Sequence, residues 1–121
     1  MKVLVTGAGG WTAAAILDAL RQHNHPVIAF DLAGSNEPDG TESIAGDVSD
    51  YQAIERAMQH VDAVVHLAVT DTYDTPDRPF AVNVKGTYNI FAAAHKHGVG
   101  RIVLMSSAGR APGRHRSRRR P

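Results

Sequence analysis

Five short, mainly apolar runs alternate with longer segments of helical periodicity along this chain. The runs cover residues 2–6, 26–30, 42–47, 62–68 and 101–107, and most are continuously apolar, as in strands buried on both faces of a sheet. The first segment between them repeats apolar residues at i, i+3, i+4 and i+7, the spacing of a helix with one buried face: Ala13, Ile16, Leu17 and Leu20. Parallel strands joined by right-handed helical crossovers accommodate this alternation. We therefore predict an α/β fold, a doubly wound parallel sheet of about five strands in the order 3-2-1-4-5.

The turn between the first strand and the first helix has the sequence Thr6-Gly7-Ala8-Gly9-Gly10. Backbone N–H groups and the helix dipole favour an anion at a helix start. Gly7 permits a sharp turn, and Gly10 leaves no side chain between the backbone and a pyrophosphate. Trp11 either covers this turn or packs at the start of the helix. Such glycines also occur in ordinary tight turns, but between a strand and a helix they indicate a Rossmann-like dinucleotide site.

The second predicted strand ends in Asp31, 18 residues after the small residue Ala13. A carboxylate at a spacing of about 20 residues binds the ribose hydroxyls of a dinucleotide; the alternative is an ordinary loop acid. A carboxylate would repel the 2′-phosphate of NADP, and residues 32–35 contain no Arg or Lys to hold one. We therefore expect NAD as the cofactor, with NADP less favoured.

Further candidate residues fall where the other strands end, because ligands of such sheets lie outside the carboxyl ends of the strands. Asp47 and Val48 follow the third strand, Leu67 and Ala68 close the fourth, and Ser107 closes the fifth. These residues join Gly7, Gly10, Trp11 and Asp31 as the predicted site.

Two helix boundaries can also be predicted. Ser49 and Gln52 have the form of a capping box that begins the second helix. A later helix is expected from about residue 80 to residue 97, where Gly98 would end it.

With 121 residues the chain forms one domain at most. It contains no cysteine, which excludes disulfides and thiolate metal sites, and its paired histidines at i, i+2 do not share a helix face, so we expect no metal site. Its apolar segments are shorter than the roughly 20 residues that cross a bilayer, and its N-terminus lacks the features of a signal peptide. We expect a cytoplasmic protein with no membrane partner.

Charge divides the chain into two parts. Residues 1–108 carry 7 Lys and Arg against 12 Asp and Glu, whereas residues 109–121 carry six Arg and no acid. We therefore predict a dinucleotide-binding domain, itself incomplete, at residues 1–108 and an arginine-rich disordered tail at residues 109–121.

The tail contains only Gly, Arg, Ala, Pro, His and Ser. These are amino acids that G- and C-rich codons supply, so we interpret the tail as the product of a frameshift or truncation near Ala108. The alternative is an arm that binds nucleic acid or an acidic surface by neutralising phosphates.

The motifs together resemble the extended short-chain dehydrogenase/reductase family, of the NAD-dependent epimerase/dehydratase type. The resemblance covers residues 1 to about 108 and rests on five segments in order: Thr6-Gly7-x-x-Gly10-x-x-Ala13, Gly46-Asp47-Val48, His66-Leu67-Ala68, Asn83-Val84-x-Gly86-Thr87 and Arg101-Ile102-Val103-x-x-Ser106-Ser107. It implies that Asp47 and its neighbour Val48 contact adenine and that residues 66–68 line the adenosine side. It also implies that the fifth strand leads to a catalytic Ser107.

In this family the catalytic Ser is followed well downstream by Tyr-x-x-x-Lys, whose Tyr is the acid/base. No Tyr or Lys follows Ser107 here, so Ser107 is the one remaining catalytic candidate, and a lone hydroxyl contributes little to proton transfer. We also expect no sixth or seventh strand and no substrate-binding lobe, which would leave an exposed apolar edge and favour oligomers.

The resemblance implies the dinucleotide-binding part of an NAD-dependent epimerase, dehydratase or dehydrogenase that acts on a sugar or nucleotide-sugar. As this chain it is predicted to be inactive. The alternatives are a non-catalytic NAD(P)-binding sensor and a nucleic-acid-associated protein that binds through residues 109–121.

Overall fold

The computed structural model describes residues 1–34, 41–70 and 75–106 of the chain. Five parallel strands form one sheet in the order β3-β2-β1-β4-β5. β1 (Val3–Thr6) lies at the centre between β2 (Val27–Asp31) and β4 (Ala63–His66), while β3 (Glu42–Ala45) and β5 (Arg101–Leu104) form the two edges. The predicted strand order, 3-2-1-4-5, is confirmed.

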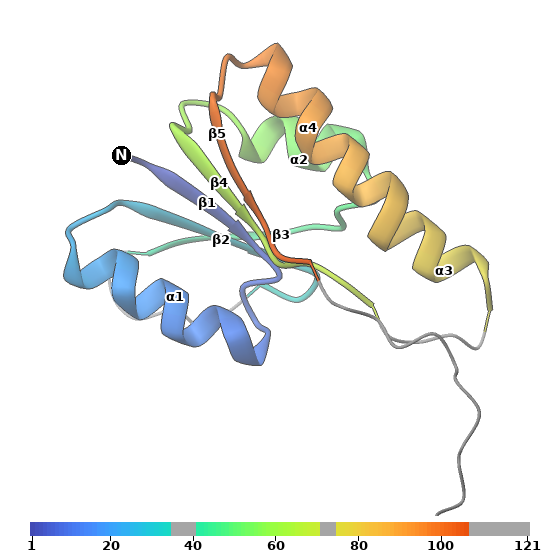
Figure 1. Cartoon of the computed structure of the whole chain (residues 1–121), viewed down its shortest axis with the longest axis horizontal. Helices are drawn as coiled ribbons and strands as arrows, with labels where there is room; N and C mark the ends of the chain where they lie inside the picture. Colours follow the sequence, from blue (N-terminus) through green and yellow to red (C-terminus); the bar gives the residue numbers. More distant parts are fainter. Residues whose placement is uncertain (35–40, 71–74, 107–121) are drawn as a thin grey trace, which may run out of the picture.

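Helices cover both faces of this sheet, as Figure 1 shows. On one face α1 (Trp11–Gln22) packs Ala13 and Leu17 against β1 residues Val3 and Val5. On the other face the helices α2 (Tyr51–Ala57) and α4 (Thr87–Lys96) bury the alternate strand residues, among them Leu4. Successive side chains of a strand point to opposite faces, so the continuous apolar strands feed two separate cores.

The chain is helical without a break from Asp77 to Lys96. It begins as α3 (Asp77–Pro79), continues as a π-helix, η1 (Phe80–Gly86), and ends as α4. The predicted start at about residue 80 was therefore three residues late. Pro79 can lie inside the helix because it is in the first turn, where a backbone N–H has no helical partner in any case. The predicted end is confirmed: Gly98 has φ +69°, and the N–H of Val99 donates to the Ala94 carbonyl at 2.8 Å.

The start of α2 differs from the predicted capping box by one residue. Asp50, not Ser49, is the N-cap, and its carboxylate accepts a hydrogen bond from the Gln52 N–H. Ser49 is instead engaged with Asp47, which accepts both its N–H at 2.9 Å and its hydroxyl at 2.8 Å. Ser49 thus bonds to the Asp47 side chain instead of capping the helix, and the capping-box pattern does not predict this contact.

β5 is an apolar edge of the sheet. It pairs with β4 alone among the described strands, and Val103, Leu104 and the adjacent Met105 are 55%, 45% and 50% exposed. The expected exposed apolar edge is present.

Candidate functional site

The glycine turn between β1 and α1 brings the backbone close to β4. Gly7 has φ +70°, and a Cβ built on it would lie 2.7 Å from the backbone nitrogen of Ala68. Only glycine fits there without strain. The N–H of Gly10 donates to the Gly7 carbonyl at 3.0 Å, which closes the turn.

The start of α1 is open to a ligand. Gly10 is the N-cap of α1 and supplies no side-chain hydrogen bond, and the first turn of the helix contains no acidic residue. The dipole of this helix therefore presents partial positive charge with no carboxylate to neutralise it. Ala13 is 1% exposed and therefore lies on the buried face of α1, as predicted.

Asp31 lies beside this turn. Its Oδ2 accepts a hydrogen bond from the Gly9 N–H at 2.8 Å, and its Oδ1 accepts one from the Leu32 N–H at 2.7 Å. These two hydrogen bonds hold the Asp31 carboxylate against the glycine turn.

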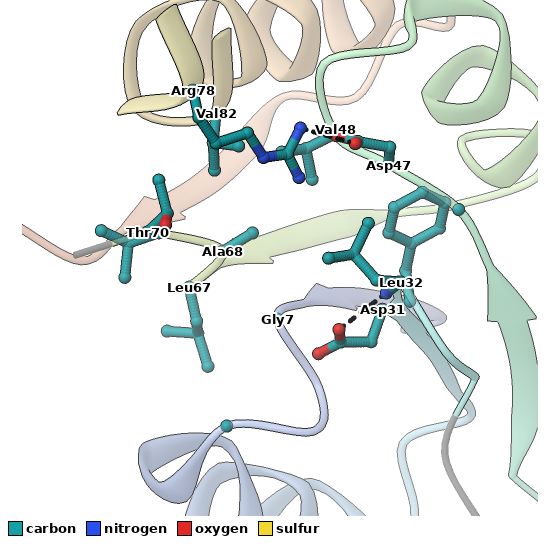
Figure 2. Close-up of a pocket in the computed structure, with 14 residues that line it drawn as sticks. Gly7, Asp31, Leu32, Asp47, Val48, Leu67, Ala68, Thr70, Arg78 and Val82 are labelled. Carbon is teal, nitrogen blue, oxygen red and sulfur yellow. Dashed lines mark hydrogen bonds and ion pairs between the residues drawn. The ribbon is translucent and has the colours of Figure 1, made fainter. Parts of the chain in front are cut away.

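Two clefts of about 440 Å³ each flank the glycine turn. The first, here the β2-side cleft, opens between the ends of β2, β3 and β4, and Figure 2 shows Asp31 and Asp47 on its walls. The second, here the β5-side cleft, is lined by Trp11, Met105 and Ser106. Gly7, Gly10, Leu67 and Val69 line both clefts. The glycine turn is therefore a ridge over which one elongated ligand can reach both clefts.

The Asp47–Val48 segment forms a rigid wall of the β2-side cleft. Arg78 of α3 donates from Nη1 to Asp47 Oδ2 at 2.8 Å. Burial acts to raise the pKa of Asp47, but the hydrogen bonds from Ser49 and Arg78 outweigh it and hold that pKa below its ordinary value. Asp47 is therefore a fixed anion.

Val48 is held from its other side by the long helix. It is 5% exposed, and a Cβ built on Gly86 would lie 2.7 Å from Val48 Cγ2. The Asn89 side chain donates to the Val48 carbonyl at 2.9 Å. Gly86 thus lets η1 lie against this wall.

A buried polar chain runs beneath the clefts, and it was not predicted. The Ala68 N–H contacts Thr6 Oγ1 at 3.4 Å, and Thr6 Oγ1 lies 2.6 Å from His66 Nδ1. His66 Nε2 lies 3.2 Å from Thr87 Oγ1, which donates to the Asn83 carbonyl at 2.8 Å. Since Thr87 donates its proton to the Asn83 carbonyl, it accepts from His66 Nε2–H, and in the neutral form of His66 the Nδ1 atom then accepts from the Thr6 hydroxyl. Burial lowers the pKa of His66 from 6.5 to about 4, in agreement with this neutral form.

The side chain of Asn83 extends the chain of contacts to the cleft wall. Its Oδ1 accepts from the Thr70 N–H at 2.9 Å, and its Nδ2 donates to the Thr70 carbonyl at 3.0 Å. Both bonds tie Thr70, in the segment after β4, to the π-helix, whereas the N–H groups of Leu67 and Ala68 donate to Thr6 of β1.

The structure brings most predicted site residues together. Gly7, Gly10, Asp31, Asp47, Val48, Leu67 and Ala68 all line the β2-side cleft. Trp11 lines the β5-side cleft and not the β2-side cleft, and its side chain is 95% exposed, so the choice between its two predicted positions stays a prediction. His66 is 2% exposed and lies below the cleft rather than on its wall. Ser107 and residues 109–121 lie outside the described residues.

Sequence reasoning missed Arg78. Its partner Asp47 is 31 residues away, and no spacing rule links them. The one available signal is that Arg78 is a lone cation directly after an acidic stretch, Asp71, Asp74 and Asp77.

Two negative findings apply to the described part of the chain. No three His, Asp or Glu side chains gather there as a metal site requires. None of its helices is long and apolar enough to cross a membrane.

Comparison with known proteins matches residues 3–120 to the family model for the NAD dependent epimerase/dehydratase family. A 2-alkyl-3-oxoalkanoate reductase of Stenotrophomonas maltophilia is 39% identical over 110 aligned residues, and the match covers 88% of this chain and 33% of that protein. A uronate dehydrogenase of Pseudomonas syringae pv. tomato is 30% identical over 112 residues, covering 88% of this chain and 39% of the relative. The chain thus spans about a third of the length of these curated relatives.

Among solved structures, a short-chain dehydrogenase/reductase superfamily protein from Agrobacterium tumefaciens with bound NAD superposes with a TM-score of 0.77 at 39% identity. The match covers 88% of this chain and 33% of that one.

Proposed function

This chain belongs to the NAD dependent epimerase/dehydratase family, and from that premise we propose that residues 1–108 bind NAD across the glycine turn. The observation that carries the proposal is the pair of clefts that share Gly7 and Gly10 beside the uncapped start of α1. A dinucleotide consists of two nucleotides joined by a pyrophosphate, and this arrangement offers two cavities joined by an anion-binding helix start.

The residues of the β2-side cleft suit the adenosine half of NAD. Asp31 would accept hydrogen bonds from the ribose hydroxyls, while Asp47 and Val48 would contact adenine. Leu67 and Ala68 provide an apolar floor, which Asn83 fixes through Thr70. Trp11, in the β5-side cleft, would cover the turn on the nicotinamide half.

We propose that NAD binds more tightly than NADP. Two unit charges about 4 Å apart repel by about 4 kcal/mol at an effective dielectric of about 20, and solvent weakens this at an open cleft. The Asp31 carboxylate should therefore favour NAD by at least roughly tenfold, which corresponds to about 1.4 kcal/mol.

Calorimetric titration of both cofactors against the purified chain tests this. The Asp31→Asn variant should bring the two dissociation constants together, whereas Asp18→Asn, on the outer surface of α1, should leave their ratio unchanged. Equal or tighter binding of NADP to the unaltered chain would refute the role given to Asp31. If neither cofactor binds, the proposed function itself fails.

For the whole enzyme we propose oxidation or epimerisation of a sugar hydroxyl. NAD, when bound, takes up or returns a hydride; Ser107 would hydrogen-bond the reacting oxygen, and a Tyr from outside these 121 residues would take its proton. A relative that is a uronate dehydrogenase supports a sugar substrate. These 121 residues by themselves should show no turnover, because no Tyr or Lys follows Ser107. Measurable NAD-linked oxidation of a sugar by the purified chain would contradict this.

The arginine-rich residues 109–121 permit two further proposals. If a frameshift produced them, another reading frame of the gene after codon 108 should encode Tyr-x-x-x-Lys. If they form a nucleic-acid-binding arm, a chain lacking residues 109–121 should lose salt-dependent binding to RNA.

The alternative function is a non-catalytic NAD(P) sensor. A sensor requires tight binding, in the low micromolar range or better, whereas an interrupted enzyme without the rest of its cofactor site should bind weakly. The same calorimetric titration distinguishes them.

The exposed apolar residues on and beside β5 also support self-association of this chain. Light scattering after size-exclusion chromatography should show oligomers; a monodisperse monomer would argue against them.

A further inference from the structure

We propose that Arg78 stacks its guanidinium on the purine base of the bound nucleotide and is a specificity-determining residue of the β2-side cleft. The proposal rests on the proposed function, because it takes the base end of that cleft as the adenine site. It assigns a role to a side chain that none of the sequence motifs contains.

The position of Arg78 is the first observation. Arg78 lines the cleft together with Asp47, Val48 and Val82, and Figure 2 shows its side chain extending from the helix across the cleft to Asp47. The ion pair at 2.8 Å holds one end of the guanidinium, which restricts the rotamers of the Arg78 side chain before any ligand arrives. Pre-orientation reduces the rotamer entropy that a long side chain loses on binding.

The anchor of Arg78 is itself immobile. Asp47 Oδ1 is occupied by two hydrogen bonds from Ser49, which leaves Oδ2 for Arg78. The backbone before Asp47 is also tightly packed, since a Cβ built on Gly46 would lie 2.6 Å from the ring of Phe30. The pair therefore forms one rigid rim at the base end of the cleft.

The remaining walls of the cleft suit a flat aromatic ligand. Val48, Val82, Ala68 and Leu32 present apolar surface, and Leu32 is 61% exposed although it borders the site. Covering an exposed leucine with an aromatic ring removes apolar surface from water, which favours binding of the ring. Arginine stacks on aromatic faces through its planar, weakly hydrated guanidinium, whereas lysine offers only a point charge.

Stability does not account for the ion pair. The side chains of Arg78 and Asp47 are 41% and 30% exposed, and pairs this accessible contribute little to folding. Arg78 is also the one cation among the described residues that line this cleft, where Asp31 and Asp47 are both acidic. Its charge therefore lowers the repulsion that the two carboxylates would exert on an anionic nucleotide.

The test compares ADP with CDP, which share the ribose and pyrophosphate and differ in the base, by calorimetric titration of the full 121-residue chain. Arg78→Lys keeps the charge and can keep the ion pair, but it removes the planar group. We expect this variant to bind ADP about fivefold more weakly and CDP less than twofold more weakly. The matched control is Arg21→Lys, since Arg21 pairs with Asp18 on α1 away from the cleft, and it should change neither constant.

Each outcome decides a different point. Unchanged ADP binding by Arg78→Lys, or equal losses for ADP and CDP, overturns stacking, because equal losses report charge rather than the base. A melting temperature equal to that of the control variant shows that a selective loss of ADP binding is not a folding defect. If the unaltered chain binds neither ADP nor NAD, the proposed function fails and not the role of Arg78 within it.

Discussion

Replacement of Gly7 and of Gly10 by alanine should separate a glycine that the fold requires from a glycine that the ligand requires. At Gly7 the added Cβ would lie 2.7 Å from the Ala68 nitrogen and 2.9 Å from its Cα. Both are backbone atoms of the neighbouring chain segment, so they cannot rotate away. The φ of +70° adds a second penalty, because alanine disfavours the left-handed region.

The magnitude follows from these two contributions. The left-handed conformation costs about 1–2 kcal/mol, and forced displacement in a packed region costs about 1–3 kcal/mol. Alanine recovers about 0.4–1 kcal/mol by restricting the unfolded chain. Gly7→Ala should thus destabilise the fold by about 3 kcal/mol and lower the melting temperature by about 10 °C.

Gly10→Ala should behave differently. Gly10 has φ −76°, which alanine adopts freely, and its Cβ would meet only the Gly7 carbonyl oxygen, at 3.1 Å. The expected cost is about 1 kcal/mol or less, mainly because alanine is a poorer N-cap than glycine. Its Cβ would instead stand at the helix start where a pyrophosphate must approach, so NAD binding should be lost.

Urea unfolding followed by far-ultraviolet circular dichroism measures the stability of both variants. The fluorescence of Trp11 is unsuitable for this purpose, because its side chain is already 95% exposed in the folded chain. Equal destabilisation by the two substitutions, or a change below 0.5 kcal/mol for Gly7→Ala, would refute the distinction between the two glycines.

Three further predictions concern the support of the site. The free energy of unfolding should fall by about 3 kcal/mol as the pH falls from 6.5 to about 4, because His66 binds a proton in the unfolded chain and not in the folded chain. In the His66→Gln variant, the free energy of unfolding measured with urea should depend less on pH across this range. Gly86→Ala should destabilise the chain by about 1–2 kcal/mol, because the added Cβ would clash with Val48, even though alanine is the better helix former. The control Gly100→Ala, where the added Cβ meets open space, should leave the free energy of unfolding unchanged in the same assay. Asn83→Ala should cost about 2 kcal/mol and accelerate hydrogen exchange in residues 67–70, and unchanged exchange there would contradict its positioning role.

The order of the strands, the buried faces of the helices and the glycine turn could all be predicted from the amino-acid sequence. Apolar runs such as residues 2–6 and 62–68 record burial on both faces, and right-handed crossovers leave few ways to connect parallel strands. The position of Asp31 at the end of β2 could also be predicted, because it follows from the number of residues that separate it from Ala13.

The contacts at the ends of those strands, in contrast, could be identified only in the folded chain. The pairing of Arg78 with Asp47 and the bonds between His66 and Thr87 join residues 31 and 21 positions apart. Hydrophobic periodicity encodes which side of an element is buried, but a polar contact depends on where two elements come together and which rotamers their packing leaves. The N-cap lies at Asp50 and not at Ser49 for the same reason. The Ser49 hydroxyl donates to the carboxylate of Asp47, which follows β3, and is therefore not available to cap the helix.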